Sequence, residues 1–384
     1  MFPLDDPLLM RLSSAARALA GPLPGGRYGL APTLGPELAA AAAGEDVELA
    51  VAVLRPAAMP PTLVDAIVGS RLLSLTGDTG SDACPVAVVG SPGCAVPMLT
   101  LHAYQRRALE RLDGLGGRGG RTVAPTYRGA SEVAGFARWA RQVVASAGAR
   151  WPHSAAVLRS EPLRVTVPGF LPESAVTARI ALLDVTALDQ QGERVHAAII
   201  VLDYRDLVGS AQQAAQLSGA ARGYYASVGT DRFVVVVDGI ERSHSGNPGN
   251  LRHTVWRRAS AALRMDLAPA SVLSVSSVLA LSSTTTSTAS ARDILRGVDD
   301  YEQSQVGAVL QALRTLRDRA GEVIAATVIR RLQAERELPD VPNSSDGGFT
   351  DEDVASSWAQ LYATACLPLI TSTLDRFDAD FAEH

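Results

Sequence analysis

Lysine is absent from all 384 residues of this chain, and each of its 35 basic side chains is an arginine. The lysine amine forms Schiff bases, acts as a general base and binds phosphate in phosphate-binding loops, and the guanidinium group rarely takes over these tasks. The sequence therefore disfavours enzyme classes that depend on a lysine. The composition, rich in arginine, alanine and glycine, indicates a GC-rich genome as the origin of the absence.

Cysteine is also scarce, and its three positions show no spacing typical of a disulfide framework or a zinc site. The cysteines are Cys84, Cys94 and Cys366. The six histidines show no HExxH or comparable metal-ligand spacing. We therefore predict free thiols in a reducing compartment and no metal centre.

An excess of positive charge is missing as well, since the formal net charge is −5 and the isoelectric point is about 5.7. This balance argues against a nucleic-acid partner. The amino terminus, MFPLDDPLLMRL, has two aspartates where a signal peptide needs positive charge, and no run of about 18 apolar residues follows. We expect a cytoplasmic protein without a membrane span.

What the sequence does contain is a series of Val-, Ile- and Leu-rich runs that predict buried strands. They cover residues 47–54, 163–168, 178–184, 196–203, 231–238 and 270–277. Helical patterns fill gaps between them, at residues 62–73, 207–226 and 250–265. Strands that alternate with helices predict an α/β fold with a doubly wound, mostly parallel sheet.

Three regions are predicted along the chain. Residues 1–45 supply a helix and a linker, and residues 46–281 form the α/β domain with a helical insertion near residues 99–150. Residues 282–384 form a helical segment that packs with the first helix as a small bundle. The glycine-rich stretch at residues 114–121 follows no strand, so we interpret it as a connector, and GSPG at residues 90–93 as a turn.

The segment LRPAAMPPT, residues 54–62, stands between the first strand and its helix, where a phosphate-binding loop would lie. Such a loop needs glycines that turn backbone N–H groups inward, followed by a lysine and a hydroxyl residue. Here the last positions before the helix are Pro60 and Pro61, which have no N–H group and cannot supply charge or a metal ligand.

In the order of strand, loop and helix, this region resembles the GTPase domain of the dynamin family, particularly bacterial dynamin-like proteins. The resemblance places Leu54 and Met59 at the two glycines of GxxxxGKST and Pro60 at the lysine. It places Pro61 at the hydroxyl residue that binds Mg²⁺, and only Thr62 keeps the family residue.

Similar erosion continues downstream over the 46–281 region that the resemblance covers. The DxPG turn keeps Asp184 but has Ala187 instead of the glycine whose N–H meets the γ-phosphate. The guanine-reading NKxD becomes DGIE, from Asp238 to Glu241, so that its last position keeps a carboxylate but the asparagine and the lysine are lost. Ser276 matches the start of the element beneath the base.

From this resemblance we predict a catalytically inactive dynamin-like pseudo-GTPase that uses neither GTP nor Mg²⁺. It would serve as an assembly or regulatory partner of an active dynamin-like GTPase, or associate with itself, in membrane remodelling or cell division. Membrane contact would be indirect or peripheral, at the inner face of the membrane. Two alternatives stay open: a nucleotide-binding NTPase in which Arg55 replaces the lysine, and a small-molecule sensor with a pocket at the carboxyl edge of the sheet.

Overall fold

The computed structural model describes residues 47–73, 84–114, 122–171, 178–186, 195–242, 248–283 and 302–320, together with Val323 and Thr327. All of the described residues belong to one compact unit, Glu48–Ala175 and Arg179–Asp318, except Val47, Ala178, Arg319, Ala320, Val323 and Thr327. The predictions for residues 1–45 and for most of the helical segment 282–384 lie outside the described residues.

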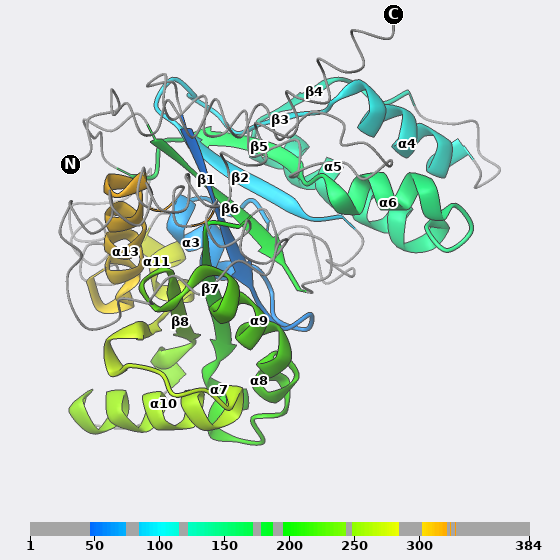
Figure 1. The fold of residues 1–384 in the computed structure, drawn as a ribbon. Helices are drawn as coiled ribbons and strands as arrows, with labels where there is room; N and C mark the ends of the chain where they lie inside the picture. Colours follow the sequence, from blue (N-terminus) through cyan, green and yellow to red (C-terminus); the bar gives the residue numbers. More distant parts are fainter. Residues whose placement is uncertain are drawn as a thin grey trace, which may run out of the picture. The chain divides into compact units, whose positions relative to one another are not determined.

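The described residues contain one nine-stranded sheet with the order β4-β3-β5-β2-β6-β1-β7-β8-β9 (Figure 1). The strands are β1 (Val47–Leu54), β2 (Val86–Ser91), β3 (Met98–Thr100), β4 (Thr126–Arg128), β5 (Leu163–Pro168), β6 (Ala178–Val185), β7 (Ala197–Asp203), β8 (Phe233–Asp238) and β9 (Val272–Val275). β1 therefore lies inside the sheet, where both of its edges are paired.

The two halves of the sheet differ in strand direction. β1, β7, β8 and β9 pair in parallel, in registers such as Leu54 opposite Ile200 and Asp203 opposite Asp238. On the other side, β2 pairs in parallel with β5 but antiparallel with β6, and β3 is antiparallel to both β4 and β5. The sheet is therefore mixed, and its parallel half consists of β1, β7, β8 and β9.

Helices follow most strands of the sheet. They are α3 (Thr62–Val68), α4 (Ala103–Gly114), α5 (Ala130–Ala147), α6 (Pro152–Ser160), α7 (Tyr204–Val208), α8 (Gln212–Gln216), α9 (Ser218–Val228), α10 (Pro248–Leu263), α11 (Ser277–Ser283) and α13 (Val306–Asp318). Short 3₁₀ turns occur at Thr230–Arg232, Ile240–Arg242 and Pro269–Ser271.

Helices cover β1 on both faces, which explains why it reads as an uninterrupted apolar run. Ala52 and Leu54 belong to a core cluster with side chains of α7, α9 and α10, such as Tyr224. Val51 and Val53 point to the opposite face, because side chains alternate along a strand, and they are equally buried. α3 contacts both α11 and α13, and the buried side chains of these three helices lie outside that cluster.

The predicted α/β class is confirmed, although several element boundaries differ. The helix predicted at residues 62–73 ends at Val68, because Gly69 adopts a left-handed conformation with φ 70°. The carboxylate of Asp65 then accepts the N–H groups of Leu72 and Leu73, at 3.0 and 2.7 Å, which holds the following segment in a non-helical path. A side chain thus competes with the helix for the backbone.

The helix predicted at residues 207–226 is divided into α7, α8 and α9. Asp203 caps α7 by accepting the N–H of Arg205 at 2.7 Å, and Ala211, with φ 52°, separates α7 from α8. The strand predicted from residue 231 begins at Phe233, after a 3₁₀ turn, and the last strand is shortened to Val272–Val275. Local turns therefore shorten elements whose apolar pattern continues further.

Three strands, β2, β3 and β4, were missing from the prediction. β2 is a short apolar run that continues into Gly90 and Ser91, the first half of the segment that we interpreted only as a turn. β3 and β4 have three residues each. β3 pairs with β5, and β4 pairs with β3. Such short strands carry almost no pattern of their own, since pairing partners determine them.

Residues 99–150 contain α4 and α5, as the helical insertion requires, together with β4 and part of β3. The division of the chain at residue 281 stays a prediction. α13 contacts α3 and β9, and the N–H of Ser276 donates to the carbonyl of Ser304 at 2.8 Å. Within the residues that are described, no helix has both the length and the apolar character needed to cross a bilayer.

Candidate functional site

The site begins where β1 ends and the chain turns into α3. Leu54, the last strand residue, is fully buried, and the loop of residues 55–61 connects it to Thr62, the first residue of α3. Pro61 precedes the helix and offers no side chain to cap it. Proline suits a helix start because its missing N–H is not needed there, so the two prolines direct the chain into α3.

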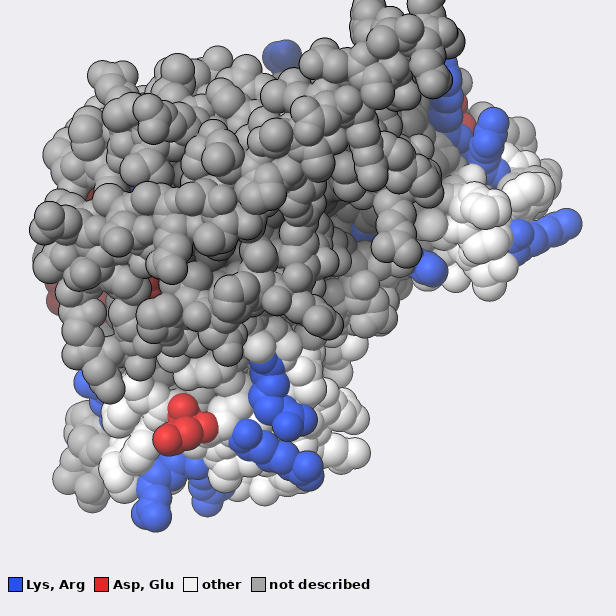
Figure 2. Space-filling view, in the orientation of Figure 1, with Lys and Arg blue, Asp and Glu red and all other residues white. Residues whose placement is uncertain are grey.

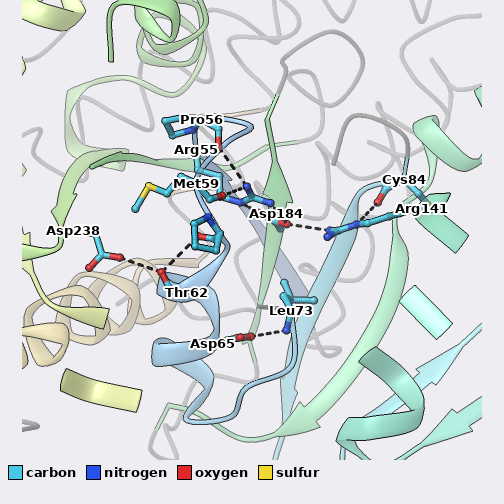
Figure 3. A network of polar contacts seen from close by, with 11 residues as sticks. Arg55, Pro56, Met59, Thr62, Asp65, Leu73, Cys84, Arg141, Asp184 and Asp238 are labelled. Carbon is cyan, nitrogen blue, oxygen red and sulfur yellow. Dashed lines mark hydrogen bonds and ion pairs between the residues drawn. The ribbon is translucent and has the colours of Figure 1, made fainter. Parts of the chain in front are cut away.

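Arg55 occupies the centre of this loop with its own side chain (Figure 3). Its guanidinium is almost fully buried and donates from Nη1 to the carbonyl oxygens of Pro56 and Met59. In a phosphate-binding loop the backbone points N–H groups inward, towards an anion. Here the loop points carbonyl oxygens towards a cation, which is the opposite polarity.

The backbone N–H groups of residues 55–62 are largely committed or missing. Arg55 N donates to Val185 O at 3.1 Å, Met59 N to Pro56 O at 3.0 Å, and Thr62 N to Pro60 O at 2.8 Å. The three prolines of the loop have no N–H. Among these eight residues, only the two alanines at positions 57 and 58 contribute further backbone donors, too few to surround a phosphate group.

Asp184, at the end of β6, is the counter-ion of Arg55. Nε of Arg55 donates to Oδ1 at 2.7 Å and Nη2 donates to Oδ2 at 3.1 Å, which is a bidentate pair. Nη2 of Arg141 donates to the same Oδ2 at 3.0 Å. Burial would raise the pKa of Asp184, but the charges and hydrogen bonds of Arg55 and Arg141 lower it below 3.8, so the carboxylate stays ionised.

Arg141 comes from α5, within the helical insertion, and is one of the largest fully buried side chains. Besides Asp184 it binds the backbone carbonyl of Cys84 through Nε at 3.4 Å. Burial raises the pKa of the Cys84 thiol to about 12, despite the opposing charge of Arg141. The insertion therefore reaches the site through one guanidinium that bridges β6 and the segment before β2.

Two guanidiniums already bind the carboxylate of Asp184, at the position where the dynamin resemblance puts Mg²⁺. A hard dication needs oxygen ligands, such as carboxylates that are not already neutralised. The described residues contain no cluster of three His, Cys, Asp or Glu side chains arranged to hold a metal. The side chains around Asp184 therefore do not fit a Mg²⁺ ion, and we derive no reaction step through one.

Asp238 forms a second node, at the end of β8. Its Oδ1 accepts the N–H groups of Gly239 and Ser277, both at 2.8 Å, and Oδ2 accepts the hydroxyl of Thr62 at 3.3 Å. The carboxylate thus joins β8 to the first residues of α3 and α11. Burial raises the pKa of Asp238 more than these hydrogen bonds lower it, and the nearby Glu241 adds to the increase.

The other predicted positions are placed around these two nodes. Met59 is buried and its carbonyl contacts Arg55, whereas Pro60 and Glu241 are exposed. Ser276 is fully buried, and its Oγ accepts the N–H of Leu279, so it caps the turn into α11. Ala187 lies outside the described residues. The structure thus brings Thr62 to Asp238, and Asp184 to the loop of residues 55–61 through Arg55.

Sequence reasoning assigned no role to Arg141. A signal was present, because Arg141 lies on the buried stripe of α5 beside Ala137, Ala140 and Val144. An arginine on the apolar side of an amphipathic helix requires a buried partner. The sequence named Arg55 as a substitute for the missing lysine, whereas its guanidinium contacts Asp184 and carbonyl groups.

Comparisons with known proteins complete this description. No protein-family model matches the sequence, and no curated protein matches it. Two solved structures of an oligomerised bacterial dynamin pair, described as a mechanism for long-range sensing and tethering of membranes, are similar to the chain. Their TM-scores are 0.38 and 0.36 at 12% and 10% identity, over 99% and 100% of this chain. The chain covers 61% and 62% of those proteins, which is less than two thirds of their length.

Proposed function

We propose that this chain is a dynamin-like pseudo-GTPase, which does not hydrolyse GTP and acts by associating with another protein. The contact that carries the proposal is the buried guanidinium of Arg55, which binds Asp184 and the carbonyl of Met59 at once. These are the positions where an active member of the family would hold Mg²⁺ and phosphate. The family assignment itself rests on the order and spacing of the eroded motifs.

The charge pattern supports the absence of GTPase chemistry. Phosphoryl transfer is catalysed by positioning and by positive groups that face the phosphate oxygens. At this site the positive groups face Asp184 and backbone carbonyls. A nucleotide would have to break a bidentate ion pair inside the protein and leave a carboxylate beside its phosphates.

The alternative of an NTPase with Arg55 in place of lysine makes an opposite prediction. It requires the Arg55 guanidinium to leave Asp184 and bind phosphate. Isothermal titration calorimetry with GTP and with ATP, each with Mg²⁺ and with EDTA, separates the two. We expect no heat of binding at millimolar nucleotide. Mg²⁺-dependent binding that disappears in Arg55→Ala would overturn the proposal in favour of the NTPase.

The partner in this proposal is an active dynamin-like GTPase or a second copy of the chain. Affinity purification of the tagged chain from its native cells, with the tag alone as control, should enrich such a GTPase or a homo-oligomer. Added Mg²⁺ and GTP should not change how much of the partner the tagged chain binds. Recovery as a lone monomer without an enriched GTPase would contradict this part of the proposal.

In a membrane-remodelling or cell-division role, the chain would reach the inner face of the membrane through that partner. The small-molecule sensor remains the competing non-enzymatic function, and it predicts a ligand at the carboxyl edge of the sheet. A thermal-shift screen of small metabolites tests it. A saturable increase in Tm that is unaffected by partner proteins would favour the sensor.

A further inference from the structure

One surface, formed by α7, α9 and α10, gathers exposed arginines. Residues 204–228 and 248–266 contain six arginines and two aspartates, although the whole chain carries a net charge of −5. All six arginines are exposed: Arg205, Arg222, Arg252, Arg257, Arg258 and Arg264. Figure 2 shows several basic side chains, with an acidic side chain among them, in the lower part of the view, where Figure 1 places α10. We call this surface the arginine face.

Most charges of the arginine face are not neutralised within the described part of the chain. α10 contains no acidic residue. Arg205, Arg252, Arg257 and Arg264 have no carboxylate within ion-pair distance among the described residues. Asp206 is held in place by the N–H of Ala214 at 2.9 Å and the hydroxyl of Ser210 at 3.3 Å.

The helices that carry the arginine face pack against one another and against the core. α10 contacts α7, α8 and α9, and Val255, Ala259 and Leu263 anchor it in the core cluster. Arg258 donates from Nη1 to the carbonyl oxygens of Leu207 and Val208, at the end of α7. A cation at this end also complements the helix dipole. Beside it, the side chain of Val208 is 41% exposed, which places an apolar spot within the charged surface.

We propose that the arginine face binds an acidic segment of a protein partner, with an apolar side chain of that segment against Val208. Guanidinium groups bind carboxylates in a bidentate manner and are enriched at protein interfaces. A membrane surface fits less well, because Val208 is the only large exposed apolar side chain on α7–α10 among the described residues. The acidic net charge of the chain disfavours nucleic acid.

This inference depends on the surface alone and not on the proposed function at the Arg55 site. The arginine face would retain its charge whether or not a nucleotide binds between β1 and α3. The experiment therefore uses the full chain without nucleotide, and its result leaves the calorimetric test of nucleotide binding untouched.

The test compares two charge-reversed variants. Arg252→Glu/Arg257→Glu/Arg264→Glu changes the arginine face but leaves Arg258, which holds α7. The control, Arg107→Glu/Arg111→Glu/Arg138→Glu, makes the same change in net charge at exposed positions of α4 and α5. Fluorescence anisotropy measures binding of a labelled peptide rich in Glu and Asp with one Leu, and of the same peptide with Gln and Asn. Phosphatidylserine vesicles and single-stranded RNA provide the other arms.

We expect the parent chain to bind the acidic peptide but not the amide peptide. The arginine-face variant should bind the acidic peptide at least about tenfold more weakly, while the control variant keeps the affinity of the parent. Circular dichroism checks that both variants are folded. If both variants lost affinity for the acidic peptide equally, net charge alone would explain the loss, and the proposal would be overturned. Absent peptide binding would also overturn it, as would tighter binding of vesicles or RNA that depends on the same arginines.

Discussion

Arg55 and Asp184 are joined by two nearly parallel hydrogen bonds, 2.7 Å from Nε to Oδ1 and 3.1 Å from Nη2 to Oδ2. Arg141 binds Oδ2 from a different element, at 3.0 Å. Two buried guanidiniums therefore share one carboxylate. This sharing determines which substitution affects the network most.

Asp184→Asn should destabilise the fold more than the loss of either arginine. It removes the buried carboxylate that both guanidiniums bind, whereas Arg55→Met or Arg141→Met removes only one of the two groups bound to that carboxylate. Removing one partner of a buried pair costs about 3–5 kcal/mol, and we expect Asp184→Asn within or above that range. Urea unfolding followed by far-UV circular dichroism gives the free energies of unfolding.

The exposed Arg107→Met is the matched control for the loss of an arginine and should change stability by less than about 0.5 kcal/mol. The order of the three buried variants is the decisive result. If Arg55→Met proved more damaging than Asp184→Asn, the carboxylate shared by the two arginines would not be the governing member of the network.

Acid should weaken the fold through Asp184. Its folded pKa lies below the ordinary value of 3.8, because Arg55 and Arg141 outweigh the effect of burial. A lowered folded pKa gives a stabilisation that is present above pH 3.8 and is lost as the pH falls through the folded value. Denaturant titrations at several acidic pH values should show this loss in the parent and not in Asp184→Asn. If the free energy of unfolding of Asp184→Asn fell with decreasing pH as steeply as that of the parent, the acid sensitivity would not come from Asp184.

Asp238 should act in the opposite direction, because burial raises its folded pKa. Its stabilisation is present below pH 3.8 and is lost as the pH rises through the folded value. Asp238→Asn keeps an Oδ1 that accepts from Gly239 and Ser277, and its amide can donate to the Thr62 hydroxyl. The variant should therefore gain stability relative to the parent as the pH rises towards neutrality.

Asp238→Ala is the control, because it removes every acceptor of that node. It leaves two buried N–H groups without a partner, at about 1–3 kcal/mol each. We expect it to be less stable than both the parent and Asp238→Asn at every pH. Similar stabilities for the alanine and asparagine variants would show that the node contributes little.

Restoring the family residues at two positions should not restore nucleotide binding. Pro60→Lys/Pro61→Ser supplies the lysine and the hydroxyl group that the dynamin resemblance requires. Arg55 still binds Asp184 and the Met59 carbonyl, so the loop keeps its polarity. We expect no Mg²⁺-dependent GTP binding in calorimetry. Binding by this variant would show that the two prolines, and not Arg55, close the site.

Cys84 should be protected from thiol reagents in the folded protein. It is fully buried, and its pKa is raised to about 12, whereas Cys94 is partly exposed. In a Cys366→Ser background, Ellman's reagent at about pH 8 should react promptly with Cys94 alone, since the thiolate is the reactive form. Urea should release the second thiol. Prompt reaction of both thiols without urea would contradict the buried position of Cys84.

The sequence predicted the frame of the site better than its contacts. The apolar run of β1, the loop and the start of α3 follow from local pattern, and so do the strand ends that carry Asp184 and Asp238. Local pattern does not give the partner of a side chain. Arg55 lies 129 residues from Asp184 in the sequence, and Arg141 lies 43 residues from it. Over such separations only the folded structure determines which side chains come into contact.

The boundaries failed for a related reason. The end of α3 depends on Gly69 and on the Asp65 carboxylate, which binds the backbone seven and eight residues later. β3 exists because β5 offers it an edge to pair with, and β4 in turn pairs with β3. The spacing of apolar residues along the sequence shows neither a side-chain hydrogen-bond acceptor nor a neighbouring strand, so the prediction lacked these features.

The bridge from Arg141 to Asp184 also bears on the order in which the protein folds. It joins α5 to β6, and β6 in turn holds Arg55 of the loop that follows β1, so the complete network requires segments far apart in sequence to have met. Contacts that close such long loops are formed late. Interactions absent from the transition state slow unfolding without speeding folding. We therefore expect loss of either buried arginine to speed unfolding more than it slows folding.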